Sequence, residues 1–298
     1  MSTPISPEDN AFLIERIRKL TSPRQPIPTG MTPIIPIAKQ IKAVMVDVYG
    51  TILITGNEPG LTSNTAHERQ SLVDALKSIG FHPASVNASR TMSDLYRNIR
   101  TDHLEQRKTR EIDFPEVDII EIWKNLPTLQ DIDPDLIPRL IVEFVTRVEQ
   151  PWLMPGLDEL LETLNDTDIA LGIISNSQFY TPLTLEALSG KSVPEMGFDP
   201  DLCFYSYECK AAKPSHYLYT MAAEGLAKRG IAPSQVLYIG NDLLKDVHAA
   251  MLVGFNAALF AGDQQSLRLH EDNAAIRDHR PDAVFTHLTQ AIQCLGIL

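Results

Sequence analysis

The amino-acid sequence predicts an α/β protein in which a doubly wound parallel sheet carries an inserted all-helical domain. Short apolar runs rich in β-branched residues alternate with helical patterns after residue 151, which is typical of a parallel sheet with helices on both faces. Residues 66 to 150 are instead almost entirely helical in pattern, which indicates a helical bundle between two parts of the sheet domain. We therefore expect an N-terminal helix and arm over 1–40, an α/β core over 41–62 and 151–298, and a helical domain over 63–150.

The N-terminal region predicts a short helix followed by an extended arm. Ser6 precedes Pro7, which is the order of a capping residue and a first helical residue, and apolar side chains recur at helical spacing up to Leu20. Residues 22–38 contain too many prolines for a helix. We expect this arm to pack on the core or on a second subunit and to carry no chemistry.

The core elements follow from apolar runs and their breaks. The run from Ile41 to Val46 predicts a buried parallel strand that ends at Asp47 and Gly50. A loop rich in glycine, threonine and asparagine follows, from Thr55 to Thr65. Helices are predicted at 72–80, 92–107, 115–123 and 136–148 in the helical domain, and at 157–164, 181–188, 217–229 and 245–253 in the core. The remaining strands are predicted at 169–174, 202–205, 236–239, 256–260 and 283–285.

The composition limits the class of partner. Acidic residues outnumber basic ones by 38 to 26, for a net charge of −12, which argues against nucleic acid or an anionic membrane as the main partner. A small anionic metabolite is still compatible with this charge, because a local cation or metal can override it. No signal peptide is evident, and no apolar stretch approaches the roughly 18 residues that span a bilayer. We expect a cytoplasmic protein, and a homodimer stays open.

Polar residues follow four predicted strands at their carboxyl ends, where the ligand sites of open α/β sheets gather. An ionised carboxylate there is costly beside a buried strand unless the site needs it. Each residue alone would be an ordinary turn or capping residue, so the interpretation depends on their combination and order. They are Asp47, then Ser175 and Asn176, then Lys213, and finally Asp242 with Asp246.

This series resembles the four sequential motifs of the haloacid dehalogenase superfamily, over roughly residues 40 to 260. The pattern Asp47-Val48-Tyr49-Gly50-Thr51 is similar to the first motif, in which the aspartate is the nucleophile. The helical domain is similar to the superfamily's helical cap in its most N-terminal insertion position. The resemblance implies a Rossmann-like core and a hydrolase that forms a covalent intermediate on Asp47.

The residue types suit the roles that the resemblance implies. Lys213 would lower the pKa of Asp47 and balance charge on the transferred group. Ser175, with the backbone N–H groups around it, would hold oxygens of that group. We assign Thr51 and Asn176 to substrate binding with Ser175 and Lys213.

The acidic residues of the fourth motif predict a metal site. Asp242 and Asp246, together with Asp47 and the backbone carbonyl of Tyr49, would form the hard-oxygen site that Mg²⁺ prefers. Asp242 is the expected direct ligand, and Asp246 would bind directly or through water. A longer-spaced form of the motif would instead place Asn241 in the first acidic position, which would weaken the site.

Tyr49 departs from the superfamily's phosphatases, most of which have a second aspartate there to protonate the leaving group and activate water. Loss of such a group costs roughly 10²–10⁴-fold in rate. Tyrosine could donate a proton, but with an ordinary pKa of about 10 it is a poor base at neutral pH. The Asp-x-Tyr-Gly-Thr arrangement is similar to that of L-2-haloacid dehalogenases, which need no metal and whose halide leaves without a proton. We keep Tyr49 among the candidate catalytic residues.

The acidic pair favours a phosphatase, because neighbouring carboxylates without partners repel each other and a bound cation would relieve this. We therefore expect an aspartate-based phosphohydrolase that acts with Mg²⁺ on a small phosphorylated metabolite. Two alternatives stay open, a metal-independent 2-haloacid dehalogenase and a catalytically weak or non-enzymatic member. A basic stretch of the cap predicts mainly a solvated face, with one or two residues meeting the substrate as the alternative: Tyr96, Arg97, Arg100, His103, Arg107 and Arg110.

Overall fold

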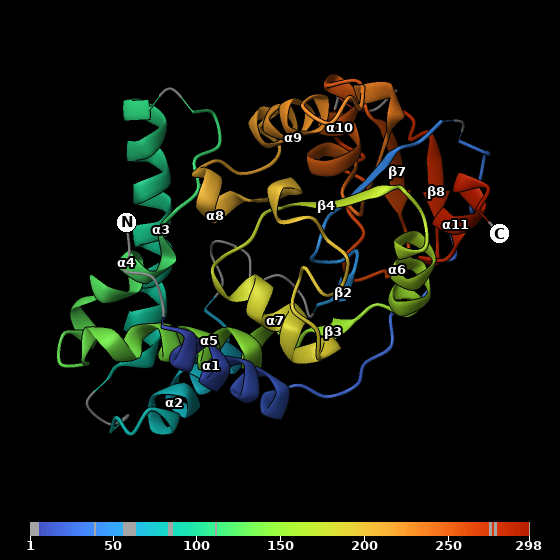
Figure 1. The fold of residues 1–298 in the computed structure, drawn as a ribbon. Helices are drawn as coiled ribbons and strands as arrows, with labels where there is room; N and C mark the ends of the chain where they lie inside the picture. Colours follow the sequence, from blue (N-terminus) through green and yellow to red (C-terminus); the bar gives the residue numbers. More distant parts are fainter. Residues whose placement is uncertain are drawn as a thin grey trace.

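A six-stranded parallel sheet forms the centre of the computed structural model, in the order β5-β4-β1-β6-β7-β8 (Figure 1). The structure describes residues 6–38, 40–55, 64–82, 86–110, 112–273, 276 and 279–297. The predicted doubly wound α/β core is confirmed, with strand ends within two residues of the expected ones. The strands are β1 (Ala43–Val46), β4 (Ala170–Ser175), β5 (Cys203–Tyr205), β6 (Val236–Gly240), β7 (Asn256–Phe260) and β8 (Ala283–Phe285).

Both faces of the sheet are covered by helices, which explains why the strands are apolar throughout. Val44 and Val46 of β1 face one apolar cluster, and Ala43 and Met45 face the other, because successive side chains of a strand point to opposite faces. The first cluster includes α6 (Leu157–Asn165), α7 (Tyr180–Ser189) and α11 (Gln290–Leu295). The second includes α9 (Tyr217–Ala227) and α10 (Ala249–Leu252).

The helical region between β2 and β3 has an apolar core of its own. Its helices are α2 (Ala66–Ser78), α3 (Ala88–Arg110), α4 (Ile119–Lys124) and α5 (Ile137–Glu149). Trp123 packs against Phe144 at its centre, with ring centroids 5.3 Å apart. The helix expected from residue 115 begins only at Ile119, because the Asp118 side chain caps it by accepting from Glu121 N–H. Most of the loop expected at 55–65 lies outside the described residues.

Two short strands link this helical region to the sheet. β2 (Leu53–Ile54) and β3 (Trp152–Leu153) pair antiparallel where the chain leaves the sheet and where it returns. Strands of two residues have no periodic signal, so the sequence did not predict them. None of the helices in the described part of the chain is long and apolar enough to cross a membrane.

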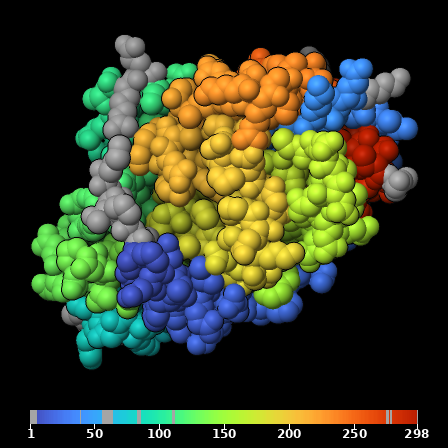
Figure 2. Space-filling model, viewed as in Figure 1, coloured from blue at the N-terminus to red at the C-terminus, as the bar shows by residue number. Residues whose placement is uncertain are grey.

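The N-terminal helix α1 (Pro7–Leu20) lies across the boundary between the helical region and the core (Figure 2). Leu13 and Ile17 are buried in one cluster with Val142 of α5 and with residues of α7. Arg16 forms an ion pair with Glu143 of α5, whereas Arg18 Nε donates to the Ala187 carbonyl of α7 at 3.1 Å. The helix is therefore joined to both parts of the molecule.

The arm after α1 follows the core to the far edge of the sheet. Arg24 Nη1 donates to the Glu149 carbonyl at 3.3 Å, at the end of α5. Ile34 then forms an isolated antiparallel bridge with Val284 of β8, with N···O distances of 2.9 Å in both directions. The arm packs on the core, which is one of the two arrangements that the sequence left open.

Candidate active site

Asp47 lies at the carboxyl end of the central strand β1, as its place in the sequence predicts. Its N–H donates to the Ile239 carbonyl of β6 at 2.9 Å, and its side chain is almost fully buried. The carboxyl ends of β4 and β6 flank it, because both strands pair in parallel with β1. This topology brings residues far apart in the sequence to one edge of the sheet.

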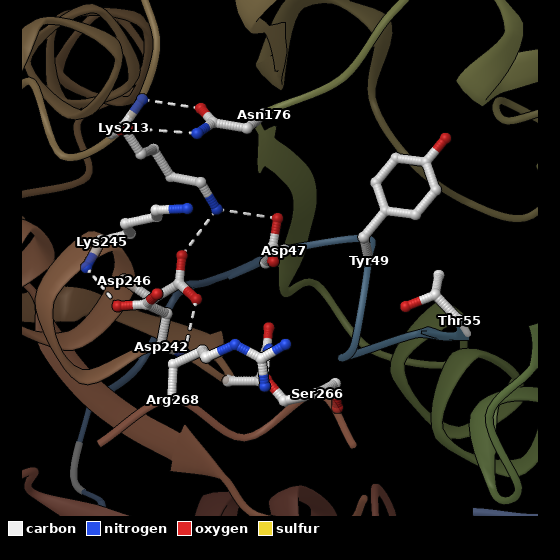
Figure 3. Close-up of a pocket in the computed structure, with 11 residues that line it drawn as sticks. Asp47, Tyr49, Thr55, Asn176, Lys213, Asp242, Lys245, Asp246, Ser266 and Arg268 are labelled. Carbon is white, nitrogen blue, oxygen red and sulfur yellow. Dashed lines mark hydrogen bonds and ion pairs between the residues drawn. The ribbon is translucent and has the colours of Figure 1, made fainter. Parts of the chain in front are cut away.

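Lys213 is the central contact of the site. Its Nζ lies 2.7 Å from Asp47 Oδ1 and 2.6 Å from Asp246 Oδ1, so one buried ammonium joins two carboxylates (Figure 3). Tyr238 OH at 3.2 Å and the Ile174 carbonyl at 3.3 Å complete its surroundings. A buried charge requires such partners, since desolvation is otherwise costly.

Asn176 holds the backbone on which Lys213 sits. Its Oδ1 accepts from Lys213 N–H at 2.6 Å, and its Nδ2 donates to the Lys213 carbonyl at 3.0 Å (Figure 3). Both polar ends of the amide are therefore engaged by the protein itself. Asn176 therefore positions Lys213, and because it also lines the cavities beside Asp47, the predicted substrate contact stays a prediction.

Burial and the charge of the ion-pair partner shift the pKa values of Asp47 and Lys213 in opposite directions. Burial raises the pKa of Asp47 to about 6, against the lowering effect of Lys213. The lowering expected from Lys213 is therefore present but is outweighed. Burial alone would lower the pKa of Lys213, yet Asp246 and Asp47 together raise it to about 12. At neutral pH, Lys213 is a cation and Asp47 is mainly ionised, as a nucleophile must be.

The two acids of the fourth motif have separate partners. Asp242 caps the π-helical segment η6 (Leu243–His248), and its Oδ1 accepts from Leu244 N–H at 2.9 Å and Lys245 N–H at 2.7 Å. Asp246 Oδ2 accepts from Asp242 N–H at 2.9 Å, while its Oδ1 is bound to Lys213. The premise that these carboxylates lack partners is therefore wrong, because a helix N-terminus and a buried lysine compensate their charges.

Gly240 explains how Asp246 can reach back to Lys213. A Cβ at residue 240 would lie 2.4 Å from Asp246 Cγ, so a larger residue would displace the carboxylate. The π-helical segment, with Val247 N–H donating to the Asp242 carbonyl at 3.1 Å, turns Asp246 toward the sheet. Such segments recur at functional sites. The sequence predicted an ordinary helix here, since nothing in its pattern distinguishes a π-turn.

The loop after β1 is packed against Asn241. Gly50 has a φ of +81°, and a Cβ there would lie 2.5 Å from Asn241 Nδ2, so this turn requires glycine. Thr51 Oγ1 donates to Asn241 Oδ1 at 3.2 Å, and Asn241 Nδ2 donates to the Ser266 carbonyl at 2.6 Å. Thr51 is fully buried, so its place fits loop support better than the predicted contact with substrate.

Ser175 and Tyr49 are the two other candidate catalytic residues near Asp47. Ser175 is fully buried, and its hydroxyl lies near enough to Asp47 to lower the pKa of that carboxyl, while it donates a long hydrogen bond to the Asn176 carbonyl at 3.5 Å. The ring of Tyr49 extends away from Asp47, and its hydroxyl lies 2.9 Å from Thr181 Oγ1 (Figure 3). Burial raises the pKa of Tyr49 well above its ordinary value, so this phenol is a poor general base.

Two adjoining cavities open at this edge of the sheet. The smaller, of about 40 Å³, is lined only by polar or charged side chains. They are Asp47, Tyr49, Thr55, Asn176, Lys213, Asn241, Asp242, Lys245, Asp246, Ser266 and Arg268. The larger, of about 520 Å³, shares five of these residues and extends to α3. The sequence missed Lys245, Ser266 and Arg268, because only the tertiary fold places them beside Asp47.

The donor set at the small cavity fits Mg²⁺ through two carboxylates. Asp47 and Asp242 both line it, and Mg²⁺ commonly takes one or two carboxylates, with water and substrate oxygens filling its other positions. Within the described ranges, no three acidic, histidine or cysteine side chains form a ready metal cluster. Both oxygens of Asp246 are engaged, Oδ1 by Lys213 and Oδ2 by Asp242 N–H, so a water-mediated role suits Asp246 better than direct binding. The ligand roles of Asp246 and the Tyr49 carbonyl stay predictions.

Comparison with known proteins identifies the family of this chain. The family model described as haloacid dehalogenase-like hydrolase matches residues 41–254, which is most of the chain. The chain belongs to the haloacid dehalogenase-like hydrolases. The match covers Asp47, Lys213 and both acids of the fourth motif, whereas α1 and the arm lie outside it.

Individual relatives of this hydrolase are distant. An uncharacterized hydrolase of Schizosaccharomyces pombe is 24% identical over 225 residues, which is 74% of this chain and 90% of the relative. The solved 2-haloacid dehalogenase from Pseudomonas syringae pv. Tomato is 19% identical, with a TM-score of 0.54, over 86% of this chain and 98% of its own. A phosphatase from Thermococcus onnurineus has the same identity, with a TM-score of 0.49, over 86% and 99%. The likeness to the dehalogenase shows the shared fold alone.

Proposed function

We propose that this hydrolase is a phosphohydrolase that uses Asp47 as its nucleophile, together with Mg²⁺, on a small phosphorylated metabolite. The observation that carries the proposal is the lining of the small cavity next to Asp47, which is polar or charged at every position. A phosphoryl group presents oxygens on all sides and suits such a lining. The halogen-bearing carbon of a haloacid would instead need apolar contacts.

The proposed reaction begins with attack of an Asp47 oxygen on phosphorus, which forms the O–P bond of an aspartyl phosphate and breaks the ester P–O bond. The alkoxide or phenolate that leaves takes a proton from water. Water then cleaves the acyl phosphate and regenerates Asp47. Lys213, held between two carboxylates, lies where it stabilises negative charge on the phosphoryl oxygens. Lys245 and Arg268 line the same cavity and add positive charge. Mg²⁺ held by Asp47 and Asp242 would further neutralise the phosphoryl oxygens.

One observation favours the dehalogenase as a second candidate. Tyr49 occupies the place of the expected acid–base carboxylate, and its hydroxyl is engaged by Thr181. A halide leaving group needs no proton, so this departure would be harmless in a dehalogenase. The two candidates share Asp47 and differ in leaving group and metal.

A substrate panel with and without Mg²⁺ separates these functions. We expect inorganic phosphate to be released from phosphomonoesters in the presence of Mg²⁺, and no halide to be released from 2-haloacids. Halide release that is independent of Mg²⁺, without phosphate release, would establish the dehalogenase instead. Release of neither product would favour the non-enzymatic alternative.

Metal binding can be tested without turnover. Millimolar Mg²⁺ should raise the melting temperature of the wild type, because a ligand selective for the native state stabilises it. Asp242→Asn should lose most of this rise while keeping the helix cap, since asparagine caps helices about as well as aspartate. Asp133→Asn, at the exposed cap of η3 (Pro134–Leu136), is the matched control and should respond as the wild type does. An unchanged Mg²⁺ response in Asp242→Asn would remove this residue from the metal site.

The position of Tyr49 predicts that kcat/KM depends strongly on the acidity of the leaving group. Since its hydroxyl is held by Thr181 and points away from Asp47, phosphate esters of acidic phenols should react far faster than alkyl phosphates (Figure 3). Tyr49→Asp should recover part of a roughly 10²–10⁴-fold deficit on alkyl phosphates. The measurement is kcat/KM against the pKa of the leaving alcohol, with Tyr49→Phe as the control that removes only the hydroxyl. A flat dependence in the wild type would mean that another residue supplies the proton.

A further inference from the structure

The larger cavity, of about 520 Å³, lies between the core and α3 and opens beside the small one. The two cavities share Lys213 and Lys245, so a substrate whose phosphoryl group occupies the small cavity would extend into the larger. On its far side are His103 and Arg107 of α3 and Phe114 from the segment after it. These side chains are therefore candidates to contact the end of the substrate that does not react.

The carboxylates that line the larger cavity are already engaged. Glu116 accepts from Ser206 Oγ at 2.6 Å and from Val117 N–H at 2.9 Å. Glu149 also has a partner within the protein. Burial, and next the charge of Glu149, raise the pKa values of Tyr49 and Tyr180. The acidic groups thus belong to the protein's own contacts.

Arg107 is an available cation at that side. Its guanidinium carbon lies 5.5 Å from the ring centroid of Phe114, which holds the side chain over an aromatic face. In the described part of the chain Arg107 has no carboxylate partner, whereas Arg90 and Arg97 of the same helix both pair with Asp94. A guanidinium without a carboxylate is suited to bind one from a ligand, through two parallel hydrogen bonds.

His103 lies one helical turn before Arg107, on the same side of α3. Burial is the main effect on the pKa of His103 and lowers it. The charge of Asp102 raises this pKa, and the charge of Arg107 lowers it. A neutral imidazole beside the guanidinium offers a hydrogen-bond donor without adding a second charge. The pair therefore provides one charge and one further polar contact, backed by the ring of Phe114.

We propose that His103, Arg107 and Phe114 form a subsite for a second anionic group at the end of the substrate opposite the phosphoryl group. The inference rests on the proposed phosphohydrolase function and names its substrate class, which is a small phosphomonoester that also carries a carboxylate or a second phosphate. Arg107 binds the anion, His103 donates a hydrogen bond to it, and Phe114 covers the apolar body between the two charged ends. The basic stretch of α3 is thus not only a solvated face, since two of its residues select substrate.

Two aryl phosphates of the same size test this subsite, 4-carboxyphenyl phosphate and its neutral isostere 4-carbamoylphenyl phosphate, with the smaller phenyl phosphate as a reference that lacks the substituent. We expect the wild type to prefer the carboxylate over the carbamoyl compound by roughly five- to twentyfold in kcat/KM, which is modest because Arg107 is partly solvated. Benzene-1,4-diyl bisphosphate separates the two sources of the anion, since a higher kcat/KM than that of the carboxylate would identify a second phosphate as the preferred group.

Arg107→Met should remove the preference by raising KM for the carboxylate compound and leaving its kcat unchanged. For the carbamoyl compound, both kcat and KM should stay unchanged. Arg100→Met, on the same helix but outside the cavity lining, is the matched control and should keep the preference. The ratio of kcat/KM for the carboxylate compound to that for the carbamoyl compound is compared between the wild type and Arg107→Met, because each compound has the same leaving group in both. An unchanged ratio in Arg107→Met would overturn the subsite.

Binding without turnover keeps this test independent of the proposed chemistry. Calorimetry should show that 4-hydroxybenzoate binds more tightly than 4-hydroxybenzamide, and that Arg107→Met abolishes the difference. If no phosphomonoester is hydrolysed but this difference is present, the proposed phosphohydrolase function fails and the anion subsite stands. If phosphomonoesters are hydrolysed and the two ligands bind equally in the wild type, the subsite fails and the phosphohydrolase stands.

Discussion

We expect Asp47→Asn to abolish turnover while the protein stays folded. The amide has the size of the carboxylate but no nucleophilic oxygen, so the covalent step cannot occur, and removal of a nucleophile costs roughly 10⁴–10⁶-fold in kcat. Lys213 keeps Asp246 as its partner at 2.6 Å, so the buried ammonium is not left without a carboxylate. The measurements are kcat, the melting temperature, and acid-stable labelling of the protein during turnover of a labelled substrate.

The matched control for this variant is Asp94→Asn, another buried aspartate, which lies in α3 and lines neither cavity beside Asp47. It should keep wild-type turnover. Undiminished activity in Asp47→Asn would remove Asp47 from the role of nucleophile under either enzymatic candidate.

We expect Lys213→Met to lower both activity and stability. The substitution leaves Asp47 and Asp246 as two buried carboxylates that have lost their shared cation, and breaking a buried ion pair in this way costs about 3–5 kcal/mol of unfolding free energy. Activity should fall by roughly 10²–10³-fold, because a fixed cation no longer stabilises the transferring phosphoryl group.

The pH dependence of Lys213→Met has a definite sign. Burial already raises the pKa of Asp47, and loss of the lysine removes the main effect that lowers it. The pKa should therefore rise further, and the acid limb of kcat/KM should move to higher pH, since a protonated carboxyl is not a nucleophile. An unmoved acid limb would mean that this limb reports a group other than Asp47.

A double variant separates the two effects of Lys213. Asp246→Asn added to Lys213→Met removes one of the uncompensated carboxylates, so part of the lost stability should return. Activity should not return, because the cation is still missing. Recovery of activity with stability would mean that Lys213 acts only by holding the fold.

The parallel sheet accounts for how much of the site could be read from the sequence. Apolar runs predicted β1, β4 and β6, and polar residues after them predicted Asp47 and Asp242 at one edge, because the carboxyl ends of parallel strands meet there. Residue types and their order were enough for this step. The turn at Gly50 was predictable in the same way, since a positive φ favours glycine.

The roles within that edge were harder to predict. Thr51 and Asn176 were expected to contact substrate, but their polar atoms are engaged by Asn241 and by the Lys213 backbone. Asp242 and Asp246 were expected to be unpaired, but a helix N-terminus and Lys213 compensate them. Hydrogen-bond partners of this kind come from segments far apart in the chain, so no local pattern identifies them.

The sequence by itself predicted the α/β fold, the helical insertion and the place of Asp47 at the end of the central strand, because each depends on periodicity or on a residue that follows one strand. Only the tertiary structure decided that Lys213 joins Asp47 to Asp246, that Tyr49 points toward Thr181, and that Arg107 and His103 line the larger cavity. The physical reason is that periodicity reports which face of an element is buried, whereas charge pairing and cavity lining depend on which elements meet. That packing is set by the whole core, including α1 and the arm, and no short window of sequence contains it.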